Sequence, residues 1–99
     1  MVELILELLE EVYGLTSQMR RSGVSVPSNI AEGSQRGSNK DFARFVLIAK
    51  SSLAELETQV ILSHELEFTK EGQMGSILEK IDELNRMLFS FHKKLTTDH

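Results

Sequence analysis

Apolar residues recur at alternating spacings of three and four along the chain, a period typical of amphipathic helices. The pattern runs without interruption over residues 1–19, and its strict continuation places Ser22, Val26, Asn29 and Gly33 on the same face. We therefore expect one long helix over about residues 2–33. Gly33 is a natural C-terminal stop for it, because glycine readily adopts the left-handed conformation that ends many helices.

Pro27 lies inside this first segment. A proline in a helix interior removes one backbone hydrogen bond and costs about 3 kcal/mol. Gly23, four residues earlier, presents no side chain to the proline ring. The pattern predicts a single helix bent near Pro27, and the alternative is two helices broken within residues 23–27.

A second helix is expected from about residue 38 to about residue 67. Ser38 followed by Asp41 resembles a capping box, in which two side chains satisfy the first backbone donors of a helix. The main apolar stripe consists of Phe42, Val46, Ala49, Leu53, Leu56 and Val60. Two further sides are also apolar, formed by Leu47, Ala54, Ile61 and by Ile48, Leu62, Leu66. A helix that is apolar nearly all round is expected to be buried nearly all round, which in a chain of 99 residues favours association with another subunit.

A third helix is expected after Thr69, which can cap it. Its apolar stripe consists of Ile77, Ile81, Leu84, Leu88, Phe91 and Leu95. The opposite face is charged, and Asp82 and Arg86 stand four residues apart, where they can form an ion pair. The pattern predicts an all-α fold with a single domain over residues 1–99: a small antiparallel bundle of three long helices, four-helix-bundle-like, with a short fourth helix as the alternative.

Three stretches resemble a known family: YGLTSQMRR at residues 13–21, SVPSNIAEG at residues 25–33 and SLAELETQ at residues 52–59. They are similar to the four-helix-bundle proteins encoded in intervening sequences of 23S rRNA genes. The same fold family includes the accessory variability protein of diversity-generating retroelements. The resemblance covers about residues 12–97 and favours the single bent helix. Through the retroelement relative it also implies a homopentamer that assists a reverse transcriptase.

The chain departs from that family near its beginning. Members carry a complete first helix, ended by a Phe-Pro pair ahead of the YGLTSQ-like segment. The corresponding place here holds Glu7 and Leu8, and a dozen residues precede Tyr13. Either the first helix has been lost or the chain is shortened, so the number of helices in one subunit, three or four, stays open.

Composition narrows the class of protein. The absence of cysteine excludes a disulfide framework and a thiolate metal site. No apolar run approaches the ~18 residues that would span a bilayer, and the first twelve residues carry four glutamates and no Lys or Arg, unlike a signal peptide. We expect a cytoplasmic protein with no membrane partner.

The net charge of −4 conceals one basic zone. Residues 18–50 carry six basic and two acidic side chains, whereas residues 1–17 and 51–92 are acidic. We single out five members of this zone as candidate contacts for nucleic acid or a partner protein: Arg20, Arg21, Arg36, Lys40 and Arg44. The alternative is that they form ion pairs with neighbouring glutamates, including those of another subunit.

Two polar residues near Pro27 have a structural interpretation. Asn29 lies on the apolar face and can satisfy backbone carbonyl groups freed near the proline. Glu32 can pair with Arg20, Arg21 or Arg36. Direct contact of Asn29 or Glu32 with a ligand is the alternative.

No pattern in the sequence indicates catalysis. His64, His92 and His99 are not spaced as metal ligands on a helix, and Glu55 and Glu57 fall on different sides of theirs. We expect no enzymatic activity and no cofactor. Two functions remain open. The first is a homo-oligomeric adaptor that weakly binds RNA, DNA or a nucleic-acid enzyme such as a reverse transcriptase. The second is a purely structural self-assembling module with an unknown protein partner.

Overall fold

The computed structural model describes residues 1–67 and 71–97, including their side chains except those of residues 3–13, 15 and 71. It contains three helices: α1 (Val2–Ser34), α2 (Asn39–Glu65) and α3 (Glu71–Thr97). The described residues contain no strand and no fourth helix, which confirms the all-α fold with three long helices. The uninterrupted apolar spacing of residues 1–19 explains why this segment extends α1 and forms no helix of its own.

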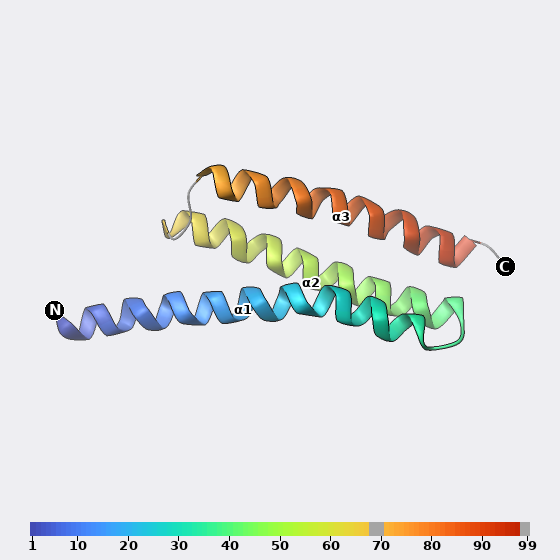
Figure 1. Ribbon diagram of the computed structural model, residues 1–99, viewed down its shortest axis with the longest axis horizontal. Helices are drawn as coiled ribbons and strands as arrows, with labels where there is room; N and C mark the ends of the chain where they lie inside the picture. Colours follow the sequence, from blue (N-terminus) through green and yellow to red (C-terminus); the bar gives the residue numbers. More distant parts are fainter. Residues whose placement is uncertain (68–70, 98–99) are drawn as a thin grey trace.

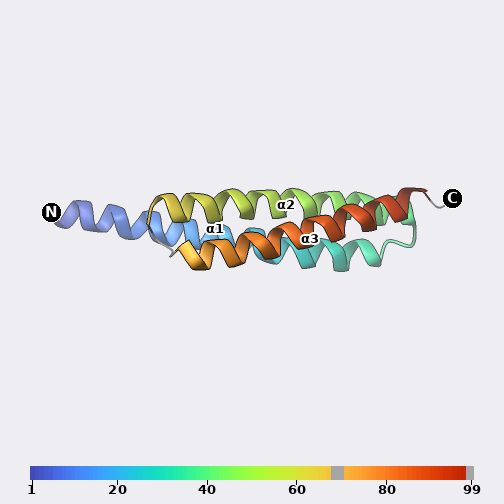
Figure 2. The ribbon, with the colours of Figure 1, turned by 90° about the horizontal axis from the view of Figure 1, so that it is seen from above.

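The three helices run antiparallel to their chain neighbours, and α2 lies between the other two (Figure 1). α1 and α3 each pack against α2, and no described Cα atom of α1 comes within 8 Å of one in α3. A view from above shows α2 raised out of the level of α1 and α3 (Figure 2). The Cα atoms extend over 62 × 25 × 13 Å. The chain therefore forms a shallow, elongated bundle in which α2 is the helix shared by both packing contacts.

The apolar core lies along α2. Val46 and Val60 are almost completely enclosed, and the ring of Phe42 meets that of Phe91 edge to face with 5.0 Å between the ring centroids. All three helices contribute buried apolar side chains: Val26, Ala43, Val46, Ala49, Leu53, Val60, Ile81, Leu88 and Leu95. These residues belong to the stripes expected from the sequence, apart from Ala43.

α1 is one continuous helix with Pro27 inside it, which confirms the single-helix prediction. Its axis changes direction gently in the second half (Figure 1). The proline lacks the N–H that would reach the Gly23 carbonyl. The Asn29 amide does not replace that donor, because its Nδ2 donates to the carbonyl of Ser25, at 2.8 Å, and to the Ser25 hydroxyl, at 3.0 Å.

A polar contact continues from α1 to α2. The hydroxyls of Ser25 and Ser52 are 2.8 Å apart and hydrogen-bonded. Ser22 and Ser52 are buried, and Asn29 is half-buried. The interface between α1 and α2 is therefore partly polar, and its small side chains let the two helices approach closely.

Gly33 has a different role from the one expected. α1 continues to Ser34, and the terminal position is taken by Gln35, whose N–H bonds the Glu32 carbonyl at 3.1 Å. Gly33 is buried against α2, where a Cβ atom would lie 2.7 Å from Cβ of Phe45. Glycine is required here for close helix packing, and the positive φ of the turn, +83°, is found at Gly37.

α2 begins as expected. Ser38 is extended, and its hydroxyl accepts a hydrogen bond from the backbone N–H of Asp41 at 3.1 Å. This is the first half of a capping box. The proposed cap of α3, Thr69, lies outside the described residues.

α2 is enclosed on one side only. The stripe that begins at Phe42 faces α1 and α3, but the two further apolar sides remain exposed, including Leu47, Ile48, Ile61 and Leu62. The expectation that this helix is buried nearly all round is wrong for the single chain, because α1 and α3 cover only the side of α2 that faces them.

Candidate nucleic-acid interface

The five basic residues singled out from the sequence are all exposed: Arg20, Arg21, Arg36, Lys40 and Arg44. They do not form one patch. Arg20 and Arg21 lie near the middle of α1, and the fourteen residues from Arg20 to the end of α1 at Ser34 correspond to about 21 Å of helix. The structure therefore divides the zone into a mid-helix pair and a group near the turn between α1 and α2.

Arg36 is held in place by two contacts. Its Nη2 pairs with Oε1 of Glu32 at 2.5 Å, and its guanidinium lies over the ring of Phe45, 4.8 Å from the centroid. Of the three partners expected for Glu32, the structure shows Arg36. Both charged side chains remain about half exposed, 46% and 57%, so the ion pair contributes little to folding stability. Its main effect is to fix the guanidinium beside the turn.

Lys40 and Arg44 lie one helical turn apart in the first part of α2. Neither has a carboxylate within 4.0 Å among the described residues, and the same holds for Arg20 and Arg21. As far as the described side chains show, the expected alternative of neutralisation by glutamates of the same chain applies to Arg36 and not to the other four. The remaining four cations can meet an external anion without breaking an ion pair with a described residue.

The other candidate chemistry is dispersed. No three His, Asp or Glu side chains of the described part lie close enough together to hold a metal ion. Glu55 and Glu57 are exposed on α2, and the expected pair of Asp82 and Arg86 is present on α3 at 3.2 Å. His99 lies outside the described residues.

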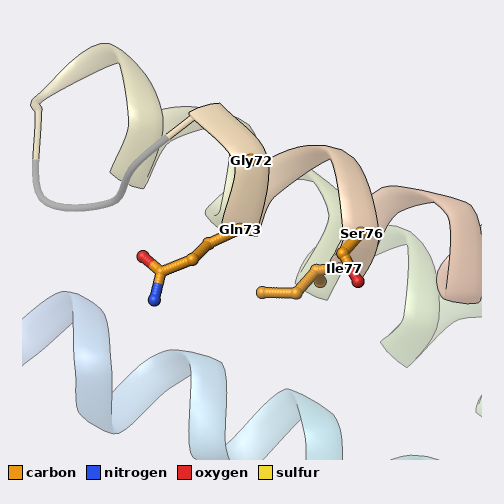
Figure 3. A pocket seen from close by; sticks show the side chains of 4 residues that line it. All are labelled: Gly72, Gln73, Ser76 and Ile77. Atoms are coloured by element: carbon orange, nitrogen blue, oxygen red, sulfur yellow. The ribbon is translucent and has the colours of Figure 1, made fainter.

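Shallow hollows on the surface are open to solvent. One, at the turn, is lined by Glu32, Gln35 and Arg36. Another lies at the start of α3, where Gln73 and Ile77 extend toward α1 (Figure 3). Neither of these two hollows places a nucleophile beside a base.

Two contacts between α1 or the turn and α2 were not anticipated from the sequence. The ring of Phe45 beneath Arg36 could have been inferred, since residues that flank a short turn between antiparallel helices are neighbours in space. The bond between Ser25 and Ser52 had no such signal, because the lateral register of two helices depends on how their side chains interlock.

Comparison with known proteins decides the family. A sequence model described as "23S rRNA-intervening sequence protein" matches residues 2–90. The chain belongs to this family. The fold is also similar to the crystal structure of a protein of unknown function from the S23 ribosomal protein family of Bacteroides thetaiotaomicron. That protein is 32% identical, with a TM-score of 0.79, and the match covers 93% of this chain and 87% of that one.

No curated protein matches this family member. No helix in the described part of the chain is long and apolar enough to cross a membrane. The family assignment confirms the resemblance seen in the three motif stretches, and the structural similarity extends it over most of the bundle.

Proposed function

We propose that this protein is a non-catalytic, oligomeric helical-bundle adaptor that weakly binds nucleic acid or a nucleic-acid enzyme such as a reverse transcriptase. One observation carries the proposal. Lys40 and Arg44 are exposed and without a described ion-pair partner, and they lie in the first part of α2, just after the turn that holds the anchored guanidinium of Arg36. Exposed cations of this kind can contact the phosphates of a nucleic acid, which is a polyanion.

The expected affinity is low. The chain carries a net charge of −4, so its overall field repels a polyanion. At physiological salt this repulsion is screened over about 8 Å, and a local group of cations can still bind phosphates. Self-association would repeat the group and raise the apparent affinity through avidity.

The test is a titration of a labelled single-stranded RNA and a labelled DNA duplex, followed by fluorescence anisotropy between about 20 and 150 mM KCl. We expect micromolar or weaker binding at low salt, with log affinity falling by about 0.7–0.9 per phosphate contact for each unit of log salt. The variant R36Q/K40Q/R44Q should lose this binding. Within it, K40Q and R44Q should matter more than R36Q, because Arg36 is already paired with Glu32.

The matched control is R20Q/R21Q/K80Q, which removes the same number of exposed cations at positions in α1 and α3 away from the turn. It should keep most of the binding, and circular dichroism should show both triple variants folded. No binding at low salt, or equal loss in both triple variants, would contradict the proposed site.

A second candidate function is a purely structural self-assembling module with an unknown protein partner. It is favoured by the sequence pI of about 5.3 and by the internal pairing of Arg36. A protein that self-associates but binds neither probe at low salt would support this second candidate.

A further inference from the structure

Phe89 is an aromatic residue on the surface of α3, and 59% of it is exposed to solvent. It belongs neither to the buried core nor to the half-buried side chains that pack against the core. The ammonium group of Lys50, on α2, lies over its ring, 5.0 Å from the centroid. A cation over an aromatic face is attracted to it, so Lys50 holds the ring in place. Most of the ring nevertheless remains available to a ligand.

The surroundings of this ring are rich in cations. Residues 42–54 of α2 and residues 84–97 of α3 contain no Asp or Glu. The two stretches pack against each other, as the contact between the rings of Phe42 and Phe91 shows. Their basic residues are Arg44, Lys50, Arg86, Lys93 and Lys94. This part of the α2–α3 seam is therefore locally positive within an acidic chain.

Lys93 is the cation best placed to act together with the ring. It lies one helical turn after Phe89, and residues four apart are neighbours on a helix surface. It is exposed and has no carboxylate within 4.0 Å among the described residues. Arg86, three residues before the ring, is instead paired with Asp82 at 3.2 Å. Lys93 can thus meet an anion beside the ring without losing an ion pair to a described residue.

The ring and the basic group at the turn lie at the same end of the bundle. α3 runs antiparallel to α2, so the last part of α3 lies beside the first part of α2 (Figure 1). Lys40 and Lys50 are ten residues apart on α2, which corresponds to about 15 Å along the helix and about 80° around it. A strand that crosses from the turn to α3 would meet cations along its path.

We propose that a single-stranded nucleic acid binds across the α2–α3 seam, with one base stacked on the ring of Phe89 and the adjoining phosphate on Lys93. This inference rests on the nucleic-acid binding proposed above and names the form that is bound. Proteins that bind single strands without sequence preference combine cations with exposed aromatic rings, because every base has a flat face. The bases of a duplex are already paired and stacked, so they are not available to this ring.

Two strands of equal charge test the stacking. The probes are a labelled oligothymidylate of about 15 nucleotides and an abasic strand of the same length, titrated by fluorescence anisotropy at several salt concentrations. We expect the unaltered chain to bind the strand with bases at least about fivefold more tightly. F89A should abolish this preference and leave the salt slope unchanged, because no phosphate contact is lost. K93Q should instead lower the slope by about 0.7.

M87A is the matched control for F89A. Met87 is also on α3 and is 61% exposed, but two helical residues are about 200° apart, so it lies on another side of the helix. Its truncation removes exposed apolar surface without touching the ring. Binding of both strands should stay within about twofold of the original. Both variants are expected to fold because both positions are exposed, and circular dichroism checks this.

A tryptophan at the same position reports the contact directly. The chain has no tryptophan, so F89W introduces its only indole. The larger ring keeps a stacking surface, and F89W should therefore bind oligothymidylate at least as tightly as the unaltered chain. Its fluorescence should be quenched by oligothymidylate and much less by the abasic strand.

The possible failures of this inference differ from failure of the proposed function. Binding that is lost in R36Q/K40Q/R44Q but unchanged in F89A would overturn the stacking and leave the proposed function intact. Equal loss of both strands in F89A, or equal loss in F89A and M87A, would also overturn it, since the ring would then not act on a base. A duplex bound as tightly as a single strand of the same length would do the same. No binding of any probe at low salt would overturn both proposals.

Discussion

Two glycines of α1 differ in what a methyl group would meet. A Cβ atom at Gly33 would lie 2.7 Å from Cβ of Phe45 and 2.9 Å from Cδ1 of Phe42, whereas one at Gly23 would meet nothing within 4 Å. Both positions are helical, so alanine gains roughly 0.5–1 kcal/mol of intrinsic helix stability at each. Packing therefore decides whether alanine raises or lowers the free energy of unfolding at each position.

We predict that Gly33→Ala lowers the free energy of unfolding by about 1–3 kcal/mol, since the methyl group forces α1 and α2 apart. Gly23→Ala, the matched control, should raise it by up to about 1 kcal/mol. Urea denaturation of the two variants measures both values. Shifts of the same sign and size would show that Gly33 does not set the spacing of the two helices.

The sequence predicted that Gly33 matters but not why. Its position before a polar turn suggested a helix end, which is the commonest use of a glycine at such a place. The structural reason lies twelve residues away in Phe45, a contact that local spacing does not contain. Asn29 gave a similar outcome. A hydrogen bond from Asn29 to the backbone was expected. The acceptor, however, is the carbonyl of Ser25 and not that of Gly23, which Pro27 leaves without a donor.

At the scale of helices, the two interfaces of α2 differ in chemistry. The contact with α1 includes Ser25, Asn29 and Ser52 in one hydrogen-bonded row, whereas the contact with α3 buries mainly apolar side chains such as Leu88. A hydrogen-bonded row constrains the axial register of two helices more strongly than apolar contacts do. The row therefore aligns α1 with α2.

We predict that Asn29→Ala lowers the free energy of unfolding by about 1 kcal/mol. The loss stays near this value because the Ser25 hydroxyl keeps its bond to Ser52 and no buried acceptor is left unpaired. Ser28→Ala, at an exposed neighbouring position, is the control and should change stability by less than about 0.5 kcal/mol. Identical unfolding curves for the two variants would mean that the Asn29 amide contributes nothing.

The helices themselves could be predicted from the sequence because each apolar stripe is long. Periodicity placed the ends of α1 within one residue, and the Ser38 cap located the start of α2. Periodicity could not show which of the three apolar sides of α2 is covered by other helices. The covered side depends on how many helices pack around α2, and the sequence of α2 alone does not determine that number.

At the scale of the whole molecule, α2 is the only helix that contacts both others in the described part of the chain. The described Cα atoms of α1 and α3 stay more than 8 Å apart, so we expect α3 to open while α1 stays packed. The stabilities of α1 and α3 are therefore coupled through α2, in the same way that the repeats of a repeat protein are coupled through the neighbours they contact.

We therefore predict that native-state hydrogen exchange is slowest in α2 and that α3 opens independently. Leu88→Ala, which removes a buried side chain from the α2–α3 contact, should speed exchange in α3 at least about tenfold. Exchange in α1 should change much less. Equal acceleration in all three helices would indicate a single cooperative unit.

The spatial arrangement of the basic zone differs from what a count of its charges suggests. Counting charges identified five cations, but the chain distributes them over two helices and a turn, and the structure neutralises one of them internally. The count of charges ignored position, although the helix expected over residues 2–33 already implied that Arg20 and Arg21 lie away from the group at the turn.

An odd number of antiparallel helices has a mechanical consequence. α1 begins and α3 ends at opposite ends of the 62 Å long axis (Figure 1). Tension applied between the two ends of the bundle would therefore run parallel to the helix axes. Such tension would load the α1–α2 and α2–α3 interfaces in shear, so that all contacts along an interface resist at the same time. Peeling would instead separate these contacts one after another.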